Sequence, residues 1–198
     1  MSTFKFMDCN VPGSYADRTR KERLRWLDYF FSFHNTILDV GGTPSFWESL
    51  HIGGIDIINI KSYPGCKVGD GRKLPYEDKS YDLVVSFSTI EHVGTLEDQI
   101  QFASEIMRVG KGCLVQTPYK YFPFDVHYQI PFFNFLPYKL QYAILKTIPI
   151  GYYGIKENIE MHQSLRLLSR KDLKNLFPSG LIMEDKICGL TQSIMVMA

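Results

Sequence analysis

The sequence has no long apolar run. Its most apolar region, residues 128–155, is interrupted by Lys139, Lys146 and several prolines and glycines, so no membrane-spanning helix is expected there. The first ten residues contain no apolar stretch of signal-peptide length. We therefore expect a cytoplasmic protein.

Cysteine is sparse, and neither sign of charge is in clear excess. The four cysteines form no Cys-x-x-Cys pair, and no histidine lies at a ligand spacing from them, so we expect reduced thiols, no structural zinc and no metal. Lys plus Arg (22) nearly equals Asp plus Glu (21), and the net charge of +1 gives no general attraction to nucleic acid. The cysteines are Cys9, Cys66, Cys113 and Cys188.

What the chain does contain is the composition of one globular domain. Its 198 residues are 45% hydrophobic and 22% charged, which is enough to bury a core. We expect a single domain over residues 1–198. Short apolar runs alternate with helical stretches, which favours a parallel sheet covered by helices. The expected strands are 36–40, 54–60, 81–87 and 112–117.

Helices are signalled by caps and by apolar periodicity. Thr95 and Asp98 form a capping box that opens a helix ended by Gly110, with an expected core face of Leu96, Ile100, Ala103, Ile106 and Met107. Residues 14–34 read as an amphipathic helix with a basic outer face.

The C-terminal part predicts a further helix and a hairpin. A second capping box, Ser169 to Asp172, opens a short helix, and the strand-like runs 181–187 and 193–197 follow it. The fold class that results is α/β, with a Rossmann-like, mostly parallel sheet, helices on both faces and a C-terminal antiparallel hairpin.

The strongest chemical signal lies at the end of the first strand. Asp39 comes directly before the turn Gly41-Gly42-Thr43, and glycine there lets a ligand approach the backbone closely. A phosphate would be repelled by that carboxylate, whereas a cationic amino-acid ligand would be attracted by it. About twenty residues on, Asn59 stands where a dinucleotide fold expects an acid on the ribose.

Several motifs in order resemble the class I methyltransferases, specifically the type 11 group. The resemblance covers residues 35–118. It rests on Asp39-x-Gly41, Gly69-Asp70, Leu74-Pro75, Tyr81-Asp82-Leu83-Val84, Glu91-His92-Val93 and Arg108-Val109-Gly110-Lys111.

This resemblance implies S-adenosylmethionine as the cofactor and a role for each matching residue. Asp39 and the turn Gly41-Gly42-Thr43 would lie under the methionine moiety, Asn59 at the ribose, Asp70 and Gly71 beside adenine, and Ser88 near the amino-acid part. The chain departs from the pattern twice. The usual Gly-x-Gly-x-Gly becomes residues 41–45, Gly-Gly-Thr-Pro-Ser, and the ribose acid is an amide.

Methyl transfer to a poor nucleophile such as a sugar hydroxyl needs a general base. His127 follows the fourth strand on the side where an acceptor should enter, so it is the expected base, whereas His92 is expected to have a core or capping role. We expect O-methylation of a small-molecule, glycan or lipid-linked acceptor, and no nucleic-acid partner. Nothing in the sequence specifies an oligomeric state.

An aromatic-rich insertion at about 119–155 is expected to border the acceptor site. Part of it should be core and part an apolar wall or lid. With Lys139, Lys146 and the basic first helix, it would suit an acceptor that is both apolar and anionic, with peripheral membrane contact.

Two other functions remain open at this point. Tyr142 and Lys146 match the Tyr-x-x-x-Lys pair of short-chain NAD(P)-dependent dehydrogenases, although the glycine turn and Asn59 do not fit. The altered glycine turn also allows a catalytically degenerate binding or regulatory protein that keeps the cofactor fold.

Overall fold

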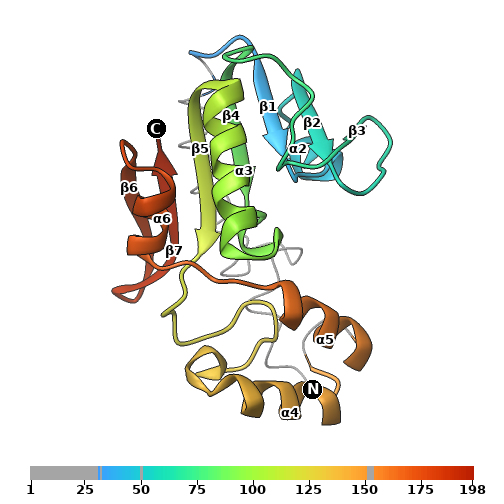
Figure 1. Ribbon diagram of the computed structural model, residues 1–198, viewed down its shortest axis with the longest axis vertical. Helices are drawn as coiled ribbons and strands as arrows, with labels where there is room; N and C mark the ends of the chain where they lie inside the picture. The colour runs from blue at the N-terminus through green and yellow to red at the C-terminus, as the bar shows by residue number, and fades with distance from the viewer. Residues whose placement is uncertain (1–30, 32, 50, 151–153) are drawn as a thin grey trace.

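The computed structural model describes residues 31, 33–49, 51–150 and 154–198. Seven strands of this described part form one sheet in the order β3-β2-β1-β4-β5-β7-β6 (Figure 1). The first five pair in parallel, whereas β7 is antiparallel to both β5 and β6. The predicted fold class, including the C-terminal hairpin, is confirmed. The strands are β1 Ile37–Val40, β2 Ile55–Asn59, β3 Lys67–Val68, β4 Tyr81–Phe87, β5 Gly110–Pro118, β6 Leu181–Ile187 and β7 Leu190–Met197.

The two faces of the sheet carry separate apolar clusters. Helices α3 (Leu96–Val109) and α6 (Arg170–Leu176) cover one face, where Phe102, Ile106 and Leu173 are buried. On the other face, the short helix α2 (Pro44–Glu48) inserts Trp47, which is 3% exposed, against β1 and β4. Nearly all of the basic helix expected at 14–34 lies outside the described residues.

Both capping boxes are present as predicted. Thr95 accepts a hydrogen bond from the backbone N–H of Asp98, whose carboxylate accepts from the N–H of Thr95, and Ser169 and Asp172 repeat the arrangement at α6. Gly110 does end α3, but it does so in an extended conformation that leads straight into β5.

The expected core face of α3 was wrong at Leu96 and Ile100. Leu96 is 41% and Ile100 is 52% exposed, whereas Gln99 and Phe102 are buried. Gln99 is buried because its amide donates to the backbone carbonyls of Ile90 and Arg166, which satisfies a polar side chain away from water. The two hydrogen bonds of Gln99 therefore turn this side chain, and not Ile100, toward the interior at the start of α3.

The segment between β5 and α6 forms a cap at the carboxyl ends of the strands (Figure 1). Its elements are the 3-10 helix η3 (Phe133–Phe135) and the helices α4 (Tyr138–Thr147) and α5 (Ile155–Ser164). Tyr128, Phe133 and Leu145 form a cluster of their own there. The cap contains most of the predicted aromatic insertion and continues beyond residue 155.

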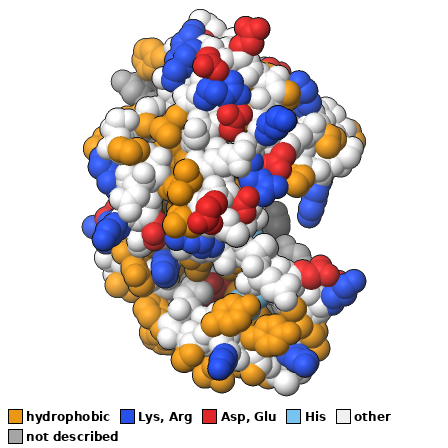
Figure 2. Space-filling model, in the orientation of Figure 1, with side chains coloured by type: hydrophobic (Ala, Val, Ile, Leu, Met, Phe, Trp, Pro, Cys, Tyr) orange, Lys and Arg blue, Asp and Glu red, His pale blue; other side chains and the backbone are white. Residues whose placement is uncertain are grey.

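The aromatic side chains of the cap divide into buried and exposed sets. Tyr128 and Phe133 are each 1% exposed, whereas Phe132, Phe135 and Tyr138 are 64%, 53% and 57% exposed. Hydrophobic side chains and lysines accordingly share the surface of the cap, and the molecule is hollowed between the cap and the sheet (Figure 2).

Two absences can be stated for the described residues. The three cysteines among them, Cys66, Cys113 and Cys188, form no disulfide. None of the helices there has both the length and the apolar character needed to cross a bilayer.

Candidate functional site

The candidate site lies where the parallel strands end. Asp39 lies one residue before the end of β1, Asn59 is the last residue of the neighbouring strand β2, and Ser88 follows β4 directly. In open parallel sheets, ligands bind outside the carboxyl ends of the strands, where the strand order reverses. Here the reversal falls between β1 and β4, so the topology brings the predicted cofactor residues to this edge.

Asp39 is a buried carboxylate, 1% exposed, that is fixed from one side. Trp47 Nε1 donates to its Oδ2 over 2.7 Å, while Oδ1 accepts no hydrogen bond from any described residue. Burial raises the pKa of Asp39 to about 7, against the opposing hydrogen bonds from Trp47 and Gly42. A cationic ligand group beside Oδ1 would favour the ionised form.

The two glycines of the turn are each required by a different neighbour. Gly41 has φ +93, and a Cβ there would overlap the side chain of Thr89. A Cβ at Gly42 would overlap the carboxylate of Asp39. The next residue, Thr43, caps α2 without a side-chain capping bond, and its hydroxyl lies 3.2 Å from that of Ser45. The turn therefore packs directly over the acid.

Asn59 holds the glycine turn closed. Its Nδ2 donates to the carbonyl oxygens of Gly41 and Gly42, both over 2.8 Å, and its Oδ1 accepts from the N–H of Lys61. A carboxylate could not make the first two bonds, because it has no hydrogen to donate. These two hydrogen bonds explain why position 59 holds an amide and not the usual acid. Any ribose contact would have to use the remaining lone pair on Oδ1.

Asp70 and Gly71 lie in the connection between β3 and β4. Both Asp70 oxygens accept from Arg72, whose hydrogen bonds hold the pKa of that carboxyl below its ordinary value. Arg72 also donates to Asp98 at the start of α3 over 2.6 Å. A Cβ at Gly71 would overlap Phe102 and crowd Val40, so this glycine is needed for close packing against α3.

Ser88 takes a left-handed backbone conformation, with φ 49. Its hydroxyl donates to Oε1 of Gln116 over 3.1 Å, and its N–H donates to the carbonyl of the same residue. A non-glycine residue in this region is strained, so the turn after β4 is held by its neighbours.

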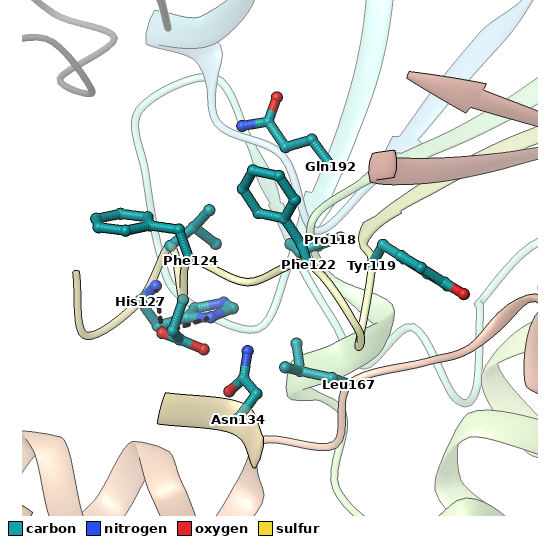
Figure 3. Close-up of a pocket in the computed structure, with 10 residues that line it drawn as sticks. Pro118, Tyr119, Phe122, Phe124, His127, Asn134, Leu167 and Gln192 are labelled. Atoms are coloured by element: carbon teal, nitrogen blue, oxygen red, sulfur yellow. Dashed lines mark hydrogen bonds and ion pairs between the residues drawn. The ribbon is translucent and has the colours of Figure 1, made fainter. Parts of the chain in front are cut away.

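A second group of polar residues lies on the cap side of the strand ends. It borders a small pocket of about 190 Å³, including its open mouth, between β5, the start of the cap and β7. Figure 3 shows His127 beside this pocket, with Phe122 and Phe124 on one side and Asn134 and Leu167 on the other. The lining is mostly apolar with few polar groups, as in small-molecule sites, although those usually exceed about 300 Å³.

His127 is positioned by Asp125. Asp125 Oδ1 accepts from the backbone N–H groups of His127 and Tyr128 over 2.8 and 2.7 Å, and it lies 3.8 Å from Nδ1 of His127. Burial alone would raise the pKa of Asp125, but these hydrogen bonds and the adjacent imidazole hold it below its ordinary value. The buried carboxylate of Asp125 therefore lies directly beside the imidazole of His127.

Glu91 and His92 complete this group. Glu91 is fully buried, and its Oε2 accepts from the hydroxyl of Thr117 over 2.9 Å. Burial raises the pKa of Glu91 to about 7, against the charge of His127 and the Thr117 hydrogen bond. Burial lowers the pKa of His92 to about 4, and the charges of His127 and Lys61 act in the same direction. The rings of His92 and His127 meet edge to face, 5.0 Å apart.

The structure therefore groups the predicted site residues in two places. Asp39, Gly41 and Asn59 contact one another or shared neighbours at the β1 turn, whereas His127 lies with Glu91 near the cap. Sequence reasoning missed the contributions of Thr117 and Asp125, and it assigned no role to Glu91. The adjacent acid and imidazole Glu91-His92 on the strand-end rim were the available signal.

One family model matches the chain, over residues 56–112, and its description is a methyltransferase domain. The match covers the segment from β2 to the beginning of β5. A comparison with curated proteins gave no match.

Solved structures share the fold over most of the chain. A protein of Pyrococcus horikoshii OT3 matches with a TM-score of 0.57 and 18% identity, covering 97% of this chain and 93% of its own. The magnesium protoporphyrin IX methyltransferase of Synechocystis PCC 6803, with SAH bound, matches with a TM-score of 0.52 and 12% identity, covering 91% and 81%.

Proposed function

We propose that the chain is a class I methyltransferase of the type 11 group that uses S-adenosylmethionine, and that it methylates a hydroxyl oxygen; the methyltransferase-domain match over residues 56–112 and the shared fold support this. The acceptor would be a small molecule, a glycan or a lipid-linked compound that enters beneath the cap. The observation that carries this proposal is the buried Asp125 beside the partly buried His127, at a pocket near the end of β5.

The residues at the β1 turn fit the cofactor. The buried Asp39 Oδ1 accepts no hydrogen bond within the described residues, which suits a cationic amino-acid group. Gly41 and Gly42 let the turn pack directly against the side chains of Thr89 and Asp39, and Ser88 borders the same edge. Asp70 would receive the adenine amino group only if Arg72 shared or released one of its lone pairs.

The dehydrogenase alternative fits this sheet poorly. The dinucleotide-binding fold of such enzymes has the order 3-2-1-4-5-6 in a mostly parallel sheet, whereas here the antiparallel β7 lies between β5 and β6. Tyr142 and Lys146 lie on α4 of the cap, and neither lines the pocket beside His127.

The chemistry divides between cofactor and protein. When bound, the cofactor supplies a methyl group activated by a sulfonium. In the proposed reaction, His127 removes the proton from the acceptor hydroxyl, and Asp125, fixed by two backbone N–H groups, keeps the segment that carries the imidazole in place. Phe122 and Phe124 exclude water from one side of the pocket, which strengthens these electrostatic interactions.

An acceptor that is both apolar and anionic suits the surface of the cap. Phe132, Phe135 and Tyr138 are exposed, and the rings of the two phenylalanines lie 6.4 Å apart. Lys139 and Lys146 on α4 are exposed as well. Exposed aromatic groups next to cations are typical of surfaces that contact lipid headgroups and acyl chains.

A methyl-transfer screen tests the proposal. The protein and cofactor with a labelled methyl group are incubated with lipid, glycan, small-molecule and protein fractions. We expect label in one of the first three fractions, and a loss of about 10²–10⁴-fold with His127→Gln at unchanged cofactor affinity. Exposed His51, on the turn after α2, provides the control variant His51→Gln. Label in protein alone would contradict the acceptor class. Cofactor binding with no transfer to any fraction would favour the binding-protein alternative.

A further inference from the structure

We propose that Glu91, His92 and His127 form a binding site for one divalent metal ion of the zinc class, at the edge of the acceptor pocket. Each residue offers one ligand atom, and these atoms all lie within 4.8 Å of one another. The location beside the acceptor rests on the proposed function, whereas the binding of the ion does not. The initial expectation of no metal considered cysteine spacings and so could not detect this group.

Two segments far apart in the sequence build the cluster. Glu91 and His92 belong to η2 (Ile90–His92), which directly follows the turn after β4, and His127 belongs to the start of the cap. The backbone of η2 is held at its first two residues. The N–H of Arg166 donates to the carbonyl of Glu91 over 2.8 Å, and Gln99 donates to the carbonyl of Ile90 over 3.0 Å. A held backbone keeps the ligand positions preorganised.

Glu91 supplies the independent sign of a ligand. Its side chain is fully buried, and Oε1 accepts no hydrogen bond from any described residue, although Oε2 is bonded to Thr117. Leaving a carboxylate oxygen buried without a donor is costly. Nε2 of His92 lies 4.0 Å from that oxygen, so the open position of Glu91 faces an imidazole. A cation between them would satisfy both groups.

Asp125 lies where a carboxylate that supports a metal-binding histidine is expected. A histidine that binds a metal commonly donates a hydrogen bond from its other ring nitrogen to a carboxylate. This bond fixes the orientation of the ring and increases its basicity. Nδ1 of His127 lies 3.8 Å from Asp125 Oδ1, and Asp125 is itself fixed by two backbone N–H groups. This leaves Nε2 of His127 available for an ion.

The donor set selects the class of metal. Two imidazoles and one carboxylate suit zinc and neighbouring transition metals, whereas magnesium prefers oxygen ligands. With metal–ligand distances of about 2.0–2.2 Å, two ligand atoms on a tetrahedral ion lie roughly 3.3–3.6 Å apart. The cluster must therefore contract by about 1 Å, which rotation of the partly exposed His92 side chain can supply.

Three protein ligands leave at least one coordination position open. A hydroxyl bound there would have a lowered pKa, because the ion acts as a Lewis acid. With the ion bound, His127 acts as a ligand and the ion activates the acceptor, whereas in the metal-free protein His127 is available as the base. The proposed O-methylation is the same in both states and only the activating group differs, so the two roles of His127 can be distinguished by experiment.

Cobalt titration tests the site directly. The full-length protein is stripped with a chelator and titrated with Co²⁺, whose visible absorption reports low-symmetry coordination, and Zn²⁺ is then added as competitor. We expect one Co²⁺ per chain, displaced by one Zn²⁺. The absorption should be lost in Glu91→Gln and His92→Gln and retained in the control His51→Gln. Asp125→Asn should weaken binding about 10–100-fold.

The outcomes separate this site from the proposed function. Glu91→Gln keeps the shape of the side chain and its bond to Thr117, so its melting temperature shows whether the variant is folded. Absence of Co²⁺ absorption in the wild type, or absorption that survives in a folded Glu91→Gln, would overturn the metal site. Cobalt binding without methyl transfer would leave the metal site standing and contradict the proposed function. Methyl transfer that a chelator does not affect, without cobalt binding, would leave only His127 as base.

Discussion

Replacing Asn59 by Asp is the most discriminating change at the glycine turn. The family pattern has an acid at this position, so the resemblance alone predicts stronger cofactor binding in Asn59→Asp. The structure predicts the opposite. The side chain donates to the carbonyls of Gly41 and Gly42 over 2.8 Å, and a carboxylate would place negative charge against both oxygens.

The magnitude follows from the two lost hydrogen bonds. Each contributes about 1 kcal/mol net, so Asn59→Asp should lower the free energy of unfolding by about 2–3 kcal/mol once carboxylate–carbonyl repulsion is included. With a urea m-value of about 2 kcal/mol/M, the midpoint should fall by roughly 1 M. Affinity for the demethylated cofactor should fall as well, because the turn that we propose to hold the methionine part is loosened.

The pH dependence gives an internal check. Facing two carbonyls, the new carboxyl would have a higher pKa when folded than when unfolded. Its penalty is therefore small at low pH and grows as the pH rises through the folded value. Urea unfolding at pH 5 and pH 8 should show a smaller deficit at pH 5, where a protonated carboxyl can donate one bond.

A matched control replaces an amide by a carboxylate on the surface. Gln101 is exposed on α3, so Gln101→Glu should leave stability within about 0.5 kcal/mol of the wild type. The reasoning is refuted if Asn59→Asp is as stable as Gln101→Glu, or if it binds the demethylated cofactor more tightly than the wild type.

Three further outcomes are expected. Burial raises the pKa of Asp39 to about 7, so calorimetry should show cofactor affinity increasing from pH 6 to pH 8 as the carboxylate ionises, and Asp39→Asn should abolish this rise. If His127 is the base, the rate of methyl transfer in His127→Gln should lose its dependence on imidazole ionisation; an unchanged pH–rate profile would rule out that role. The double variant Phe132→Ser, Phe135→Ser should float less with anionic liposomes than the wild type, at an unchanged melting temperature. The buried Phe133 is the contrast, since Phe133→Ser should lower the free energy of unfolding by about 3 kcal/mol or more. Equal flotation by the wild type and the double variant would refute membrane contact.

Features set by neighbouring residues were predictable from the sequence. Both capping boxes join partners three residues apart, so Thr95 and Ser169 could be identified before the structure was known. The strand order was partly predictable for a different reason: strands that alternate with helices along the chain restrict the sheet to a few topologies.

Features that depend on long-range register were not predictable. The partners of Asn59 lie 17 and 18 residues away, and its role depends on how β2 aligns beside β1. Gln99 was missed in a similar way, because one of its acceptors, the carbonyl of Arg166, lies 67 residues away. Polar side chains that bond across the fold leave no periodic pattern in the sequence, and several residues of the candidate site are of this kind.

The two ends of the cap meet. The N–H of Lys120 donates to the carbonyl of Leu168 over 3.0 Å, and Tyr119 forms an isolated bridge with the same residue. The whole cap therefore leaves and rejoins the sheet at one point, like an insertion into a loop. Changes in its length would cost little loop-closure entropy and would not disturb the strands. The segment that we propose to select the acceptor is thus joined to the sheet so that it can change without altering the strand ends where we propose that the cofactor binds.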